Sequence, residues 1–117
     1  MIVKLKKMIK KPPDDHHFYQ NLSQGKNYYV VEISNKSYRV FDDAKEPILY
    51  PKYLFITVDS ILPSGWSYCG SEEGEYFIGP SQLNKIGFYE DYFDGNIEAI
   101  DLFSDIFSQM VKELEGM

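Results

Sequence analysis

Hydrophobic and polar residues alternate or cluster in short runs along most of the chain, a pattern that is typical of β-strands. The run at 53–58 is almost continuously apolar, which favours burial on both faces of a sheet. Two hairpins are expected, one around the polar link 35–36 and one around residues 70–74. A shorter apolar segment at 48–50 ends at Pro51. The predicted strands cover residues 2–9, 28–33, 37–41, 53–58, 66–69 and 75–78.

The last part of the chain follows a different period. Its apolar residues recur at spacings of three and four, at Ile100, Phe103, Ile106, Phe107, Met110, Val111 and Leu114. This spacing predicts an amphipathic helix over residues 97–115, and Asp94 or Asn96 would cap its first amide groups. An apolar stripe is not stable in water, so the helix must pack against another element. The residues expected to dock it are Ile100, Phe103, Phe107 and Met110.

Together these elements predict a single α+β domain over residues 1–117. It would hold a strongly bent antiparallel sheet or an SH3-like small barrel of five to six strands, with one C-terminal amphipathic helix against an open face. Pro12 and Pro13 end the first strand, because each removes a ladder donor, and residues 42–47 favour a turn capped by aspartate. The expected regions are a basic N-terminal strand (1–11), a loop (12–26), a β core (27–79), an aromatic-acidic loop (80–95) and the C-terminal helix (96–116).

Composition favours a folded chain in a reducing compartment. The 117 residues are 44% apolar and 16% aromatic, which excludes the aromatic-poor class of disordered proteins. Cys69 is the only cysteine, so no intramolecular disulfide can form and a cytoplasmic location is expected. The first residues lack the uninterrupted apolar run of a signal peptide, and no stretch approaches the ~18 apolar residues of a membrane span. We therefore expect no membrane partner.

Basic and acidic residues are unevenly distributed along the sequence. The first eleven residues hold five of the twelve basic residues and no acid. Residues 12–117 hold the other seven basic residues and all eighteen acids, a net charge of −11. From Ser71 onward, eleven acids accompany only Lys85 and Lys112, a net charge of −9. Such a surface repels nucleic acid and anionic lipid, and it speeds the encounter with basic proteins.

No arrangement of residues indicates catalysis. Residues 14–17 (Asp-Asp-His-His) are all metal-ligand types, but adjacent side chains rarely point at one ion, so a solvated loop is expected. Cys69 lacks a nucleophile signature and is expected to be a small buried residue in its strand. Glu72, Glu73 and Glu75 lie in a predicted turn, where carboxylates are normally solvated and do not form a glycosidase pair. We therefore expect no catalytic residue, no metal, no cofactor and no enzymatic activity.

The segment 88–94 (Phe-Tyr-Glu-Asp-Tyr-Phe-Asp) combines four aromatic residues with three acids. Aromatic anchors beside carboxylates suit a Lys- or Arg-rich partner, because the rings bury area while the acids steer and pair. The alternative is a loop whose rings close one end of the barrel or pack under the helix. We expect Phe88 and Phe93 to face inward. The predicted partner-binding residues are Tyr89, Glu90, Asp91, Tyr92 and Asp94, together with Glu72 and Glu73 of the hairpin turn.

Four stretches carry a resemblance to known proteins: residues 22–30 (LSQGKNYYV), 38–43 (YRVFDD), the strand at Trp66, and 87–94 (GFYEDYFD). They resemble small β-rich immunity proteins from bacterial toxin–immunity loci, such as those of contact-dependent growth inhibition systems. Proteins of that class are commonly small, acidic and cytoplasmic, and each neutralises one cognate toxin. The resemblance implies an acidic protein that binds another protein, and it assigns no residue roles.

The function that the sequence favours is stoichiometric inhibition of a basic, nuclease-type toxin by occlusion of its active site. Acids would replace substrate phosphates while aromatic rings seal the interface. Two alternatives stay open. One is a non-enzymatic adaptor or a phage or regulatory interaction module, and the other is a small nucleic-acid-binding protein that uses the N-terminal lysines. A strand with one solvated lysine face fits those lysines better, so no nucleic-acid partner is expected.

Overall fold

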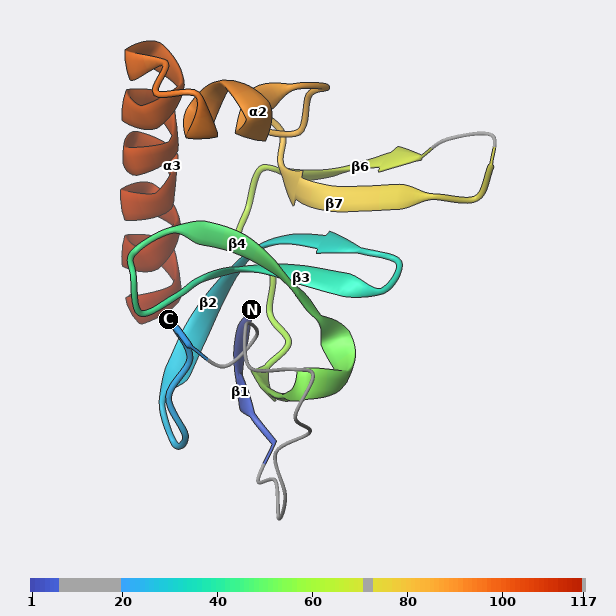
Figure 1. The fold of residues 1–117 in the computed structure, drawn as a ribbon, viewed down its shortest axis with the longest axis vertical. Helices are drawn as coiled ribbons and strands as arrows, with labels where there is room; N and C mark the ends of the chain where they lie inside the picture. Colours follow the sequence, from blue (N-terminus) through green and yellow to red (C-terminus); the bar gives the residue numbers. More distant parts are fainter. Residues whose placement is uncertain (7–19, 71–72, 117) are drawn as a thin grey trace. The chain divides into compact units, whose positions relative to one another are not determined.

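Antiparallel strands and a long C-terminal helix make up the chain (Figure 1). The structure is a computed structural model, and it describes residues 1–6, 20–70 and 73–116. The chain divides into two compact units, Met1–Ile61 and Leu62–Met117. The predicted α+β class is confirmed. A single domain over residues 1–117 stays a prediction.

The first unit contains five antiparallel strands in the order β4-β3-β2-β1-β5. A 3-10 turn, η2 (Lys52–Leu54), connects β4 to β5. The strands bend at two irregularities of register, between Ile2 and Val3 and between Val30 and Glu32, because a bulge increases the local twist. The strands are β1 (Ile2–Leu5), β2 (Asn27–Ser34), β3 (Ser37–Phe41), β4 (Pro47–Pro51) and β5 (Phe55–Asp59).

The hairpin of β2 and β3 forms around residues 35–36, as predicted. Val30 pairs with Val40, and both side chains are fully buried. Glu32 lies opposite Arg39, whose Nε is 3.2 Å from Glu32 Oε1. Burial raises the pKa of Glu32, and the guanidinium group opposes that rise. The ion pair therefore offsets part of the free-energy cost of burying the Glu32 carboxylate in the sheet.

Asp42 organises the turn between β3 and β4. Its Oδ1 accepts hydrogen bonds from the amides of Ala44 and Glu46 at 3.0 and 3.2 Å, and its Oδ2 accepts one from the Tyr50 hydroxyl at 2.7 Å. Asp42 is buried, so these bonds satisfy acceptors that water does not reach. Burial and then the Asp42 carboxylate raise the pKa of Tyr50, which keeps the phenol protonated. The predicted aspartate-capped turn is confirmed.

The second unit holds a hairpin and two helices: β6 (Trp66–Gly70), β7 (Tyr76–Pro80), α2 (Phe88–Phe93) and α3 (Ile97–Glu115). The hairpin and the helix over 97–115 confirm their predictions. Asn96 caps α3, because its side-chain oxygen accepts a hydrogen bond from the Ala99 amide at 3.0 Å. Phe103 and Met110 are buried, so α3 packs by this part of the predicted stripe, whereas Ile100, which was expected to dock, is 37% exposed.

Several local expectations are wrong. β5 exposes Ile56 and Val58 instead of burying both faces, because an edge strand has fewer covering neighbours than a central one. Cys69 is exposed, since it lies near the end of the hairpin where few side chains surround it. The segment expected as a loop at 80–95 contains helix α2. A strand was expected over residues 2–9, whereas β1 ends at Leu5. Residues 7–19, which include the Asp-Asp-His-His segment, lie outside the described residues.

Candidate functional site

The acidic charge of the chain is concentrated in the second unit. Residues 1–61 contain ten basic and seven acidic side chains, a net charge of +3. Residues 62–117 contain two basic and eleven acidic side chains, a net charge of −9. The boundary between the units therefore coincides with the change of charge along the sequence. A basic partner would be attracted to the second unit.

Helix α2 separates the rings of the aromatic-acidic segment from its acids. Residues three and four apart are neighbours on a helix, so Phe88, Tyr89 and Tyr92 share one side of α2. On this side the ring centroid of Tyr92 lies 5.3 Å from that of Phe103 in α3, and the centroid of Tyr89 lies 6.4 Å from it. Phe88 is buried, with its centroid 5.0 Å from that of Tyr89. The rings thus fasten α2 to α3.

This packing favours the alternative in which the rings pack under the helix. Tyr89 and Tyr92 are half-buried, whereas Glu90, Asp91 and Asp94 are exposed. The tyrosines therefore present only part of their surface to a partner, and the acids present most of theirs. A binding role for all five residues stays a prediction.

Exposed apolar side chains accompany these acids where α2 meets α3. Phe93, Ile97 and Ile100 are 48%, 73% and 37% exposed. The inward placement of Phe93 is wrong, because Tyr92 takes the position against Phe103 and the next residue of a helix points about 100° away. Ile100 lies at the margin of the buried stripe. We call the following residues the α2–α3 corner: Glu90, Asp91, Phe93, Asp94, Ile97, Glu98, Ile100 and Asp101.

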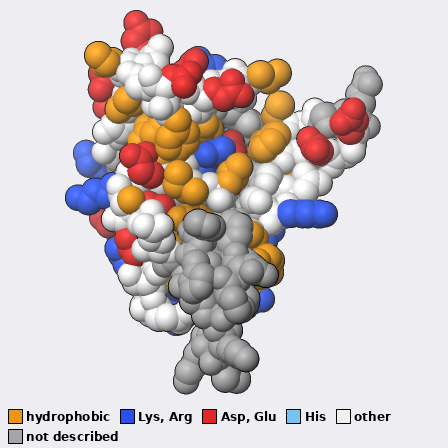
Figure 2. All heavy atoms as spheres, in the orientation of Figure 1, with side chains coloured by type: hydrophobic (Ala, Val, Ile, Leu, Met, Phe, Trp, Pro, Cys, Tyr) orange, Lys and Arg blue, Asp and Glu red, His pale blue; other side chains and the backbone are white. Residues whose placement is uncertain are grey.

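The surface of this end of the second unit mixes the two kinds of side chain. Figure 2 shows acidic and apolar side chains next to one another over α2 and the start of α3. Glu98 and Asp101 are three residues apart on α3 and exposed, so they extend the acids of α2 along the second helix. The sequence predicted aromatic anchors beside carboxylates within residues 88–94, whereas in the corner the accessible apolar groups are Phe93, Ile97 and Ile100, from two helices.

Glu73 of the predicted hairpin turn is not part of this corner. Glu73 is exposed in the turn between β6 and β7, and Glu72 lies outside the described residues. Acidic side chains at the hairpin end are visible in Figure 2 as a second group. Of the seven predicted residues, Glu90, Asp91 and Asp94 lie in the corner, whereas Tyr89 and Tyr92 lie on the side of α2 that packs on Phe103.

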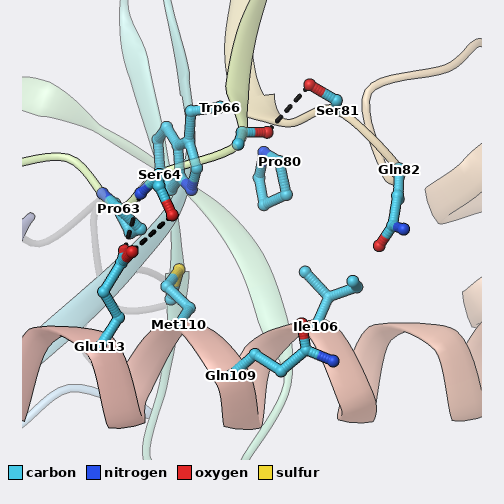
Figure 3. A pocket seen from close by; sticks show the side chains of 11 residues that line it. Pro63, Ser64, Trp66, Pro80, Ser81, Gln82, Ile106, Gln109, Met110 and Glu113 are labelled. Carbon is cyan, nitrogen blue, oxygen red and sulfur yellow. Dashed lines mark hydrogen bonds between the residues drawn. The ribbon is translucent and has the colours of Figure 1, made fainter.

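A cavity of 510 Å³ opens elsewhere in the second unit (Figure 3). Its volume lies within the range of about 300–1,000 Å³ that is usual for ligand sites. The segment before β6, the end of β7 and the last turns of α3 surround it. Among the described residues that line it, Glu113 is the only charged one. The lining consists of Pro63, Ser64, Gly65, Trp66, Pro80, Ser81, Gln82, Ile106, Gln109, Met110 and Glu113.

Glu113 is fixed at one end of the cavity by the segment before β6 (Figure 3). Its Oε2 accepts a hydrogen bond from the Ser64 amide at 2.7 Å, and its Oε1 accepts one from the Ser64 hydroxyl. These hydrogen bonds lower the pKa of Glu113, so the carboxylate is ionised at neutral pH. The amide and the hydroxyl of Ser81 both donate to the Gly65 carbonyl, at 2.8 and 2.9 Å. The segment before β6 is therefore held by Glu113 of α3 at Ser64 and by Ser81 at Gly65.

Sequence reasoning missed this cavity because its walls come from three distant segments. Trp66 appeared only as part of a strand, and Met110 only as a helix-docking residue. The available signal was the spacing of Ile106, Gln109, Met110 and Glu113, which places these residues along one side of α3. Nothing in the sequence linked that side to residues 63–66 or 80–82.

In residues 1–6, 20–70 and 73–116, no group of three His, Cys, Asp or Glu side chains is placed to hold a metal ion. Within the same part of the chain, no helix has the length and apolar character needed to cross a membrane.

Comparisons with known proteins add no identification. No protein family, no curated protein and no solved structure matches the chain.

Proposed function

We propose that the chain is a stoichiometric protein-binding inhibitor, an immunity protein that neutralises a basic, nuclease-type toxin by covering its active site. The observation that carries the proposal is the concentration of eleven acids and two basic residues in the second unit, beside the exposed apolar side chains of the α2–α3 corner. The proposed protein is cytoplasmic, has no enzymatic activity of its own and uses no cofactor.

The corner combines two properties that a fast and long-lived complex requires. The exposed carboxylates of Glu90, Asp91 and Asp94 raise the rate of encounter with a basic surface, and they replace the phosphates of the toxin's substrate. Phe93 and Ile97 lose water on contact, which slows dissociation. In this proposal the half-buried tyrosines act mainly by holding α2 on α3.

A second candidate is a non-enzymatic adaptor, or a phage or regulatory interaction module. The exposed apolar side chains of Phe93 and Ile97, which lie together with Ile100 in the corner, favour it equally, because a group of accessible apolar residues suits contact with a partner whatever the consequence of binding. The two candidates differ in one measurable respect. An inhibitor abolishes the activity of its partner, whereas an adaptor leaves that activity intact.

The test is co-expression with the product of each gene adjacent to its own, with cell growth as the first readout. The proposal predicts that one adjacent product is toxic alone, is neutralised by this chain and elutes with it as an inactive 1:1 complex. Ile97→Asp should abolish protection, whereas Ile86→Asp, the same change at a still more exposed position outside the corner, should leave protection complete. A complex that retains the partner's activity would favour the adaptor, and failure of every adjacent product to bind would refute both.

A further inference from the structure

The cavity of the second unit has an electrostatic preference for cations. Among the described lining residues Glu113 is charged and none is basic. The unit that surrounds the cavity carries a net charge of −9. Because the lining carries one negative charge and no positive charge within an acidic unit, a phosphate is disfavoured there and a positive group is attracted. Residue Glu113 is ionised and held in place by Ser64, so this attraction needs no rearrangement.

The walls favour a flat cation over a compact one. Trp66 supplies an indole ring, the best aromatic partner for a cation, and Met110 and Ile106 supply apolar surface next to it. Figure 3 shows Glu113 at one end of the cavity and Gln82 at the other. Arginine is planar, weakly hydrated and carries several N–H donors in a fixed fork, whereas the lysine ammonium is a strongly hydrated point charge.

The lining of the cavity has further hydrogen-bond acceptors for a guanidinium group. A carboxylate has about four lone-pair positions, and Ser64 occupies two on Glu113. The side-chain oxygens of Gln82 and Gln109 are further acceptors in the lining. The cavity therefore offers one charged and two neutral acceptors around an aromatic and apolar wall, which matches the donors and the faces of a guanidinium group.

We propose that this cavity binds an arginine side chain of the basic partner. The inference rests on the proposed function, because it names the residue by which that partner would be anchored in the second unit. The guanidinium donates to the Glu113 carboxylate and stacks on the Trp66 ring. Arginine is among the residues that dominate binding energy at protein interfaces, which fits an anchoring role.

Trp66 makes the proposal directly measurable, because it is the only tryptophan of the chain. Its indole ¹H–¹⁵N resonance and its fluorescence therefore report on the cavity without further assignment. The full chain is titrated with N-acetyl-arginine methylamide, with the lysine analogue and with the neutral citrulline analogue. We expect saturable shifts of the indole resonance with the arginine probe, weaker binding of the lysine probe and no saturation with citrulline.

Variants test the contribution of the carboxylate. Glu113→Gln keeps the shape of the side chain and should weaken binding of the arginine probe about tenfold, the loss expected for one charge-assisted hydrogen bond. Asp105→Asn removes the same charge from an exposed position of α3 outside the lining and should change the affinity less than about twofold. If Glu113→Gln fails to fold, Ser64→Ala keeps the charge and should weaken binding by a smaller factor.

The proposal is overturned if the indole resonance does not respond to the arginine probe, or if citrulline binds equally well. It is also overturned if Glu113→Gln and Asp105→Asn have the same effect. These outcomes are separate from those of the proposed function, since the probe is used without any partner. A chain that neutralises its toxin but ignores the probe loses only this inference, and a chain that binds the probe but inhibits no partner loses only the function.

Discussion

Replacing Phe103 with alanine tests the packing that fixes α2 on α3. The ring is 3% exposed, and its centroid lies within 5.3–6.4 Å of the ring centroids of Tyr92, Phe107 and Tyr89. Truncating a buried phenylalanine costs about 3–5 kcal/mol, and aromatic pairs contribute roughly 0.5–1.5 kcal/mol beyond their area. Three such neighbours place the expected loss in the free energy of unfolding at about 4 kcal/mol.

Urea denaturation followed by Trp66 fluorescence measures this loss, because that reporter belongs to the same unit as Phe103. With a slope of about 2 kcal/mol per molar urea, the midpoint should fall by about 2 M. Phe93→Ala is the matched control, since the same ring is removed from an exposed position, and its cost should stay near about 0.5 kcal/mol. A loss below about 1 kcal/mol for Phe103→Ala, or a larger loss for Phe93→Ala, would refute the assigned faces of the two helices.

Two further predictions concern ionisable groups. Arg39→Met should lower the free energy of unfolding at neutral pH by about 3 kcal/mol, because it leaves Glu32 buried without its ion-pair partner. Lys36→Met, at an exposed position, should change that free energy little. Chemical denaturation of the two variants compares the two losses of stability. The hydrogen bonds from Ser64 lower the pKa of Glu113, so its contribution to stability is complete above the ordinary value of 4.5 and is lost as pH falls through the lower folded-state pKa. An NMR titration of the carboxyl carbon should show that pKa return toward 4.5 in Ser64→Ala, and an unchanged pKa would contradict the stated cause.

The parts of the fold that sequence predicted well are those with a sustained local pattern. Helix α3 is 19 residues long, so its apolar stripe repeats over several turns, and Asn96 marks its start. β2 and β3 are joined by two polar residues, which is the strongest local hairpin signal in the chain. The predicted Asp42 turn follows for the same reason, because its hydrogen bonds span only a few residues.

The errors arise where neighbours distant in sequence decide the outcome. Helix α2 has six residues, too few for a helical period to be visible, so its rings could not be divided between inside and outside. Phe93 is exposed because Tyr92 packs on Phe103, a contact that no local pattern contains. The cavity is lined by residues from distant segments, and Glu113 in its wall accepts a hydrogen bond from Ser64, 49 residues earlier in the chain. The acidic character of the α2–α3 corner could be read from the sequence, but its exposed apolar side chains could not.

The most direct test of the central claim measures how fast the chain associates with the toxin identified by co-expression, at several salt concentrations. The variant Glu90→Gln/Asp91→Asn/Asp94→Asn removes three exposed charges of the α2–α3 corner. Its control, Glu75→Gln/Asp105→Asn/Glu115→Gln, removes three exposed charges of the same unit outside the corner. Both variants therefore have the same net charge, and they differ only in where the charge is lost.

Stopped-flow fluorescence gives the association rate constant for each protein. The account predicts that the corner variant associates about tenfold more slowly at low salt and loses most of its salt dependence, while the control stays within about threefold of the unmodified chain. Dissociation should change little in both, because exposed charges act mainly on the encounter. Equal association rates and equal salt dependence for the two folded variants would contradict the claim that the α2–α3 corner is the surface that receives the basic partner.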